Sequence, residues 1–170
     1  MRSVKRIIKI NEIDGYTISC LFNNGESRII DFEQLFRKWN IVKGHIAYPL
    51  VEKMEAFQKV EVEEGTLTWK NIGIPSKDEN GNVIMHYFDL DPIVLFENSV
   101  PDESKNIEIG LMIKQTRKEL GMTQEELAEK SGTTKHYISR IENSKSDIEL
   151  MTLKKIIEGG LGKRLEIKIA

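Results

Sequence analysis

Between residues 123 and 143, two short helical patterns are separated by a single glycine, Gly132. Thr123 followed three residues later by Glu126 has the spacing of a capping box, which marks the start of a first helix. Gly132 suits a tight turn because it adopts positive φ without a steric penalty. Thr134 then has the residue type of a second N-cap. The segment therefore predicts two short helices that cross at a large angle over a tight turn.

The apolar residues of this segment indicate how the two helices pack. Ala128 supplies the small side chain that a close helix crossing needs, and Ile138 and Ile141 are spaced to anchor the second helix on a core. The front of the second helix is then left exposed with the side chains of Thr134, Lys135, His136, Tyr137 and Arg140. A helix with such a face fits the major groove of B-DNA.

Two further helices are expected around this pair. Residues 107–120 have a helical pattern that ends at Gly121, a residue suited to a left-handed C-terminal cap. Residues 149–157 have a second pattern, which stops at Gly159 and Gly160. Its apolar positions are expected in the core: Leu150, Leu153, Ile156 and Ile157.

Residues 124–143 resemble the helix-turn-helix of the lambdoid phage repressors and the XRE-type regulators, and residues 107–161 resemble their whole helical domain. The match rests on the family's signature positions and on its Ile-Glu-Asn ending: Ala128, Gly132, Ile138, Ile141, Glu142 and Asn143. The resemblance implies an all-α domain that binds a double-stranded DNA operator.

The same resemblance assigns roles to individual residues. Thr134, Lys135, His136 and Arg140 match the face that reads bases, and Tyr137 lies beside them, where it could pack on a sugar or a thymine methyl. Gln124 and Asn143 match positions that contact phosphate. Two alternatives stay open: Lys145 could contact phosphate or be a solvated loop lysine, and Arg140 could instead pair with Glu142 or Glu149.

The tail of the chain alternates strictly from residue 164 to 169. Leu165, Ile167 and Ile169 share one face and charged residues the other, as in a half-buried β-strand. A lone strand with an apolar face needs a partner, and an antiparallel strand from a second subunit would provide it. We therefore expect a homodimer. The tail also resembles the ends of helix-turn-helix antitoxins of the HigA and HipB kinds.

The first hundred residues predict a small α+β domain. Residues 16–22 and 26–30 flank Asn24-Gly25, a strong hairpin signal. Asp31 can cap a short helix over residues 32–39. Later segments are expected as strands, at 57–62, 67–69 and 83–88, the last after a turn at Asn80-Gly81, and residues 93–96 as a short helix.

The polar stretch around Pro101 predicts a linker at residues 99–106, between a first domain at 1–98 and a second at 107–170. The first domain resembles a small bacterial domain of unknown function, with marks at Trp69, Asn71 and Asp91-Pro92. Such domains often accompany toxin–antitoxin pairs. The two resemblances together imply an antitoxin-like repressor that holds a cognate toxin protein.

Composition excludes several other functions. The net charge of −2 excludes a globally basic nucleic-acid binder, and a mean hydropathy of −0.37 without a long apolar run gives no membrane span. One cysteine, Cys20, cannot form an internal disulfide, so a cytoplasmic protein is expected. His45, His86 and His136 lack the spacing of zinc ligands, and no catalytic or cofactor motif is present. We expect no enzyme, metal or cofactor.

Two alternatives to the antitoxin reading remain. The protein could be a regulator whose first domain senses a small ligand or only dimerises. It could also carry a catalytic first domain to DNA, although the sequence lacks a catalytic constellation.

Overall fold

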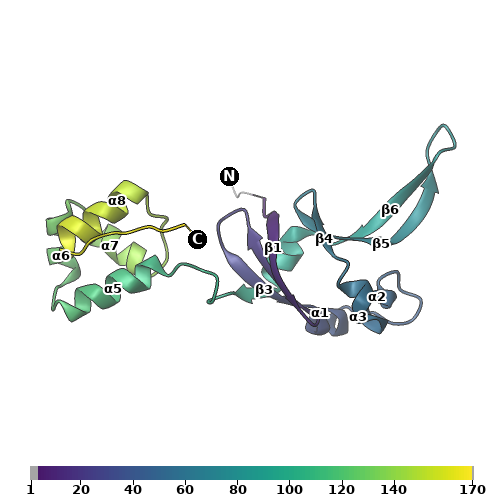
Figure 1. The fold of residues 1–170 in the computed structure, drawn as a ribbon, viewed down its shortest axis with the longest axis horizontal. Coiled ribbons are helices and arrows are strands. Elements are labelled where there is room, and N and C mark those ends of the chain that lie inside the picture. Colours follow the sequence, from purple (N-terminus) through teal and green to yellow (C-terminus); the bar gives the residue numbers. More distant parts are fainter. Residues whose placement is uncertain (1–3, 170) are drawn as a thin grey trace. The chain divides into compact units, whose positions relative to one another are not determined.

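The computed structural model describes residues 4–169, which divide into two compact units with the boundary between Asn106 and Ile107 (Figure 1). The first unit combines strands with short helices, and the second consists of helices followed by a tail. The predicted fold class, α+β followed by a helical domain, is confirmed. No helix of the described residues is both long and apolar enough to cross a membrane.

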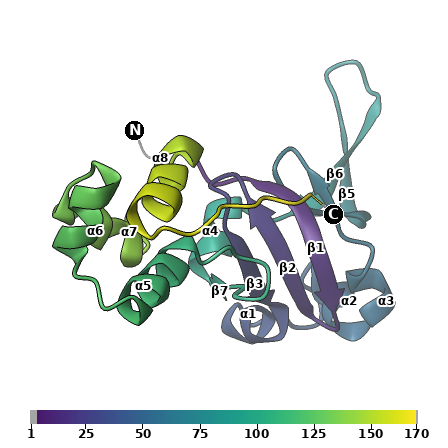
Figure 2. The same ribbon diagram turned by 60° about the vertical axis from the view of Figure 1, so that its left-hand side comes forward.

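The first unit is built on an antiparallel sheet in the order β1-β2-β3-β7 (Figure 2). Its strands are β1 (Ile7–Asp14), β2 (Thr17–Phe22), β3 (Ser27–Asp31) and β7 (Ser99–Pro101). The predicted hairpin is β2–β3, with Gly25 at φ 84° in the turn. Strand β1 was not predicted, because polar and charged residues interrupt its apolar pattern: Lys9, Asn11, Glu12 and Asp14. It pairs with β2 through two register shifts.

A second antiparallel sheet has the order β4-β5-β6, with β4 at Glu61–Glu63, β5 at Thr66–Lys77 and β6 at Val83–Asp89. The strand expected at residues 57–62 is wrong in its first half, because Phe57 ends a helix there. The Phe57 ring packs 5.1 Å from that of Phe32 and 5.8 Å from that of Trp69. Tertiary packing of this large ring outweighs the local alternation.

Four short helices complete the first unit: α1 (Phe32–Lys38), α2 (Tyr48–Glu52), α3 (Met54–Phe57) and α4 (Pro92–Glu97). As predicted, the Asp31 carboxylate caps α1 by accepting a hydrogen bond from the backbone amide of Gln34. The core contains Phe22, Phe32, Phe57 and Trp69, all fully buried. Cys20 is also in this core, where burial raises the pKa of its thiol to about 12, so the thiol stays protonated.

Residues 99–106 are not the predicted linker but the end of the first unit. Strand β7 pairs with β3, with Val100 opposite Ile29. Beyond it, Asp102 accepts a 2.5 Å hydrogen bond from the Ser19 hydroxyl, and Asn106 bonds the Ser27 backbone at both N–H and C=O. The polar residues that suggested a flexible segment instead satisfy groups at the edge of the sheet.

The second unit contains α5 (Ile109–Glu119), α6 (Gln124–Ser131), α7 (Lys135–Glu142) and α8 (Leu150–Lys154), which continues as the π-helical turn η1 (Lys155–Gly160). Ile113, Leu127, Ile138 and Ile156 form the centre of its core. Leu150 was expected in this core but is 50% exposed, because it is the first residue of its helix and precedes the packed turn.

Candidate nucleic-acid interface

Helices α6 and α7 are held by the local features that the sequence predicted. The Thr123 hydroxyl accepts a hydrogen bond from the Glu126 amide at 3.2 Å, and the Thr123 amide donates to the Glu126 carboxylate at 2.6 Å, which completes a capping box. Gly132 ends α6 at φ 64°, in the left-handed region. Ala128, at the crossing with α7, is buried. Helix α6 is therefore fixed at both of its ends, by the capping box and by Gly132.

Helix α7 has one buried face and one exposed face. Ile138 and Ile141 are buried, and Tyr137 packs partly against the same core. Thr134 begins the helix, and its hydroxyl accepts a 3.2 Å hydrogen bond from the Tyr137 amide. The predicted base-reading residues Thr134, Lys135, His136 and Arg140 are all exposed. His136 and Arg140 are one helical turn apart and share a face.

Two of these exposed side chains make weak contacts within the chain. The Lys135 ammonium lies 3.1 Å from the Glu125 carboxylate, an exposed pair of the kind that contributes about 0–1 kcal/mol. The Arg140 guanidinium donates to the Lys145 carbonyl at 3.1 Å. Arg140 thus does not form the alternative ion pair with Glu142 or Glu149. Neither contact holds its side chain strongly in place.

Glu142 forms a buried ion pair with Arg117 of α5, which the sequence analysis missed. The Arg117 guanidinium donates to both carboxylate oxygens, at 2.6 and 2.9 Å, and the Glu142 side chain has no exposed surface. Burial alone would raise the pKa of Glu142, but hydrogen bonds from Arg117 and Gln124 lower it overall. The spacing of Arg117, four residues after the core residue Ile113, is the signal that could have revealed it.

The predicted phosphate-contacting residues lie in different settings. Gln124 opens α6 half-buried, and its amide donates to Glu142 at 2.8 Å, so it belongs to the buried pair. Asn143 ends α7, where its amide donates to the Ser139 carbonyl at 2.7 Å. The Lys145 side chain is exposed in the following loop. Lys145 and Asn143 therefore lie beyond the C-terminal end of α7, and Gln124 at the start of α6.

Helices α5 and α7 approach closely at Gly110. A Cβ atom added to Gly110 would collide with the Ile141 carbonyl oxygen, so this position requires glycine. The Gly110 contact and the Arg117–Glu142 pair hold α7 from two points on α5. The orientation of α7 is thus set by α5 as well as by α6.

The tail after Gly162 has no β-ladder partner within residues 4–169. Leu165 is half-buried against the core of the second unit, whereas Ile167 is 63% exposed and Ile169 is 98% exposed. The strand expected here needs a second chain, so its pairing stays a prediction.

Comparison with known protein families matches residues 113–159 to the helix-turn-helix family. These residues span most of α5, all of α6 and α7, and α8 with most of η1. Residues 113–159 form a helix-turn-helix domain. This helix-turn-helix domain is of the XRE type that the sequence predicted, and it supports a role as a DNA-binding regulator.

Comparison with solved structures gives two kinds of similarity to this chain. The restriction-modification controller protein C.Esp1396I is 38% identical over 34% of this chain and 74% of its own, with a TM-score of 0.32. The putative DNA binding protein NE0471 from Nitrosomonas europaea is 14% identical over 92% of this chain and 88% of its own, with a TM-score of 0.36. No curated protein sequence gives a significant match.

Proposed function

We propose that the protein is a dimeric, sequence-specific transcriptional repressor and the antitoxin of a toxin–antitoxin pair. Helix α7 reads the operator, and the first unit holds the toxin protein. The observation that carries the DNA-binding half is the exposed face of α7, with Lys135, His136 and Arg140 presented on a helix whose opposite side is locked into the core. The protein acts by binding and not by catalysis.

Base reading and phosphate binding are divided between two regions of this surface. Arg140 has the length and the forked guanidinium for a bidentate contact with guanine, which contributes about 1–3 kcal/mol of discrimination. Lys145 and Asn143 lie where they can hold phosphate, which positions the helix without reading sequence. Gln124 has a second role, because it donates to Glu142 in the unbound protein.

Substitution of Arg140 tests the base-reading role. Duplexes selected from a randomised library by the wild-type protein, and scrambled versions of them, are titrated at fixed salt. Arg140→Ala should weaken binding to the selected duplex by about 1–3 kcal/mol and change binding to scrambled DNA much less. Arg140→Lys keeps the charge but lacks the fork, and should lose specificity similarly.

Lys145→Ala provides the contrasting variant. It should weaken both duplexes alike and lower the salt dependence of log K by about one unit, as expected for one lost phosphate contact. If Arg140→Ala keeps the wild-type ratio of the two affinities, α7 does not read sequence through this residue.

The proposal that the first unit binds a toxin rests on its charge and on its resemblance to a small bacterial domain that often accompanies toxin–antitoxin pairs. Residues 1–106 contain 13 Lys and Arg and 17 Asp and Glu, an acidic balance suited to a basic protein. Co-expression with the neighbouring gene tests it: a small basic product should co-purify with residues 1–106 as well as with the full chain. If the product of the neighbouring gene co-purifies with neither chain, the antitoxin proposal fails and the DNA-binding regulator remains.

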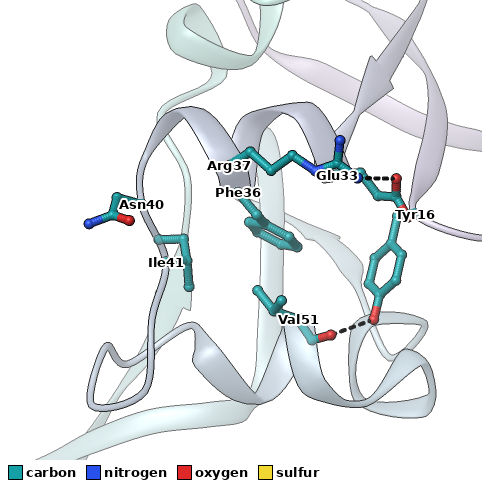
Figure 3. Close-up of a pocket in the computed structure, with 7 residues that line it drawn as sticks. All are labelled: Tyr16, Glu33, Phe36, Arg37, Asn40, Ile41 and Val51. Atoms are coloured by element: carbon teal, nitrogen blue, oxygen red, sulfur yellow. Dashed lines mark hydrogen bonds and ion pairs between the residues drawn. The ribbon is translucent and has the colours of Figure 1, made fainter.

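A pocket in the first unit favours one alternative, a regulator that senses a small ligand. The pocket has a volume of about 430 Å³, within the range of ligand sites (Figure 3). Its lining comes from the turn between β1 and β2, from α1 and the loop after it, and from α2: Tyr16, Glu33, Phe36, Arg37, Asn40, Ile41 and Val51. A ligand that changed operator affinity would favour this alternative over the antitoxin.

A further inference from the structure

Strands β5 and β6 extend beyond the rest of the first unit as a two-stranded ribbon, here called the arm (residues 71–89; Figure 1). Strand β4 pairs with β5 only at residues 66–68, so neither long edge of the arm is covered within the described chain. An isolated two-stranded ribbon is marginally stable in water, and an uncovered edge invites a further strand.

The two edges of the arm differ in their backbone groups. The Asp78 amide donates to the Asn82 carbonyl, so this pair is hydrogen-bonded. Because antiparallel pairs alternate, Pro75 and Met85, which lie opposite each other, are a non-hydrogen-bonded pair whose backbone groups point outward. Proline has no N–H, so the β5 edge lacks a donor at its centre. The β6 edge keeps its outward donors and acceptors at Val83, Met85 and Tyr87.

The same three β6 residues present an apolar surface on one face of the arm. Val83 is 66% exposed, and Met85 and Tyr87 are each 42% exposed. A Cβ added to Gly73 would lie 3.3 Å from both the Met85 methyl and the Tyr87 ring, which shows that these side chains fold over that glycine on a shared face. Main-chain bonding groups and apolar side chains therefore coincide along β6.

The charges around β6 select the occupant. Residues 83–88 contain no acid, lysine or arginine, whereas acids flank them at both ends: Asp78 and Glu79 at the tip, Asp89 and Asp91 at the base. Lys77 is the single lysine or arginine between residues 71 and 91. Hydrogen bonds from Asn82 lower the pKa of Asp78, which keeps its charge.

A second copy of β6 fits this edge poorly. Antiparallel self-pairing centred on Met85 would join Val83 to Tyr87, but it would also bring the acidic tip of each arm, with Asp78 and Glu79, toward the acidic base of the other. Like charges brought close together repel each other. A strand with basic ends would instead pair its charges with these acids.

We propose that the β6 edge of the arm binds an extended strand of a partner protein, with an apolar alternating centre and basic residues at both ends. Main-chain hydrogen bonds at Val83, Met85 and Tyr87 hold the strand, and the acidic flanks select it, as in β-strand addition. The inference rests on the proposed function for the identity of that partner as the toxin, and it names the surface and the chemistry of recognition.

Synthetic peptides test the edge with the full-length protein. The probe is a fluorescein-labelled peptide of alternating valine and threonine with lysines at both ends. Its two controls replace the lysines by glutamates or N-methylate alternate amides. Fluorescence anisotropy should show the basic peptide binding at least about tenfold tighter than either control. Equal affinities for the basic and acidic peptides, or no saturable binding of the basic one, would overturn the proposal.

Matched variants locate the binding edge. Met85→Lys places a charge on the apolar face of β6 and should weaken the basic peptide by about tenfold. Ile74→Lys makes the same charge change on β5, at a residue that is 56% exposed and belongs to the other face, and should change affinity less than about twofold. Equal loss in both variants would contradict edge binding. Both should keep the wild-type melting temperature.

Operator titrations of the same two variants separate this proposal from the proposed function. Unchanged DNA binding with about tenfold weaker peptide binding is the expected result for Met85→Lys. If the wild-type protein binds the basic peptide but no selected duplex, the repressor proposal fails and the arm proposal stands. If the wild-type protein binds a selected duplex but not the basic peptide, the arm proposal fails and the repressor proposal stands.

Discussion

At the scale of single residues, Glu142 decides how α7 is held. It is the buried carboxylate that accepts from both Arg117 and Gln124, so it ties α5 and α6 to the end of α7. Removing one partner of a buried ion pair is far more harmful than replacing both, because the remaining charge is left unpaired.

Glu142→Gln should lower the free energy of unfolding by about 3–5 kcal/mol, since it leaves the Arg117 charge buried without its counter-ion. The wild-type carboxylate has a pKa below its unfolded value, so its contribution is complete above that unfolded value, about 4.3. It is lost as pH falls through the folded pKa. Urea unfolding between pH 7 and pH 2 should therefore show a steeper acid loss for wild type than for Glu142→Gln.

Gly110→Ala should also destabilise the second unit, by about 1–3 kcal/mol, because the new methyl group meets the Ile141 carbonyl and forces α5 away from α7. Gly159→Ala is the matched control: its Cβ would meet only the Lys130 carbonyl, at an ordinary 3.6 Å. Thermal melts of residues 107–170 compare the two. Equal melting temperatures would show that the close approach at Gly110 is unimportant.

At the scale of elements, the tail differs from the rest of the second unit because it has an apolar alternation without a ladder. The Leu165 side chain packs against the core, whereas the Ile167 and Ile169 side chains are exposed. Two exposed isoleucines on one face of a potential strand are a solvation cost that a partner strand would remove.

Deletion of residues 166–170 should convert a dimer to a monomer, measured by light scattering. The deletion keeps Leu165, which packs on the core, and Lys163, whose backbone amide donates to the Ile157 carbonyl, so the helical core should keep its melting behaviour. Ile167→Asp with Ile169→Asp should act in the same way without shortening the chain. A truncated protein that remains dimeric would place the interface elsewhere.

At the scale of the whole molecule, the boundary between the two units affects what can be separated. The first unit ends at Asn106, and β7, Asp102 and Asn106 complete its sheet edge. Residues 1–106 are acidic, whereas residues 107–170 contain 12 Lys and Arg and 10 Asp and Glu. Charge therefore divides along the same boundary as structure.

Residues 1–106 should melt cooperatively and bind no operator DNA, whereas residues 1–98 should melt at a lower temperature. The shorter chain leaves the outer edge of β3 and the Ser19 and Ser27 hydrogen-bonding groups without their partners. Calorimetry compares the two chains. Equal melting temperatures would show that residues 99–106 do not stabilise the first unit and act as a linker. Operator binding by either chain would contradict the assignment of DNA binding to the second unit.

The sequence by itself determined the features that depend on neighbours along the chain. The capping box at Thr123, the turn at Gly132, the cap at Asp31 and the β2–β3 hairpin are all governed by contacts within a few residues, and each was predictable. The exposed face of α7 followed from the spacing of Ile138 and Ile141 alone.

Tertiary structure decided the features that depend on distant partners. The polar residues after Pro101 suggested a linker from sequence, but β3 and Ser19 supply their hydrogen-bond partners. From sequence, the only ion-pair partner considered for Glu142 was Arg140, whereas its actual partner, Arg117, is 25 residues away. The open edge of β6 is likewise a tertiary feature, because β6 is the outer strand of its sheet and no other strand of the described residues pairs with it. The energy of a hydrogen bond or an ion pair depends on the partner that the fold brings close, and the local sequence pattern does not specify a distant partner.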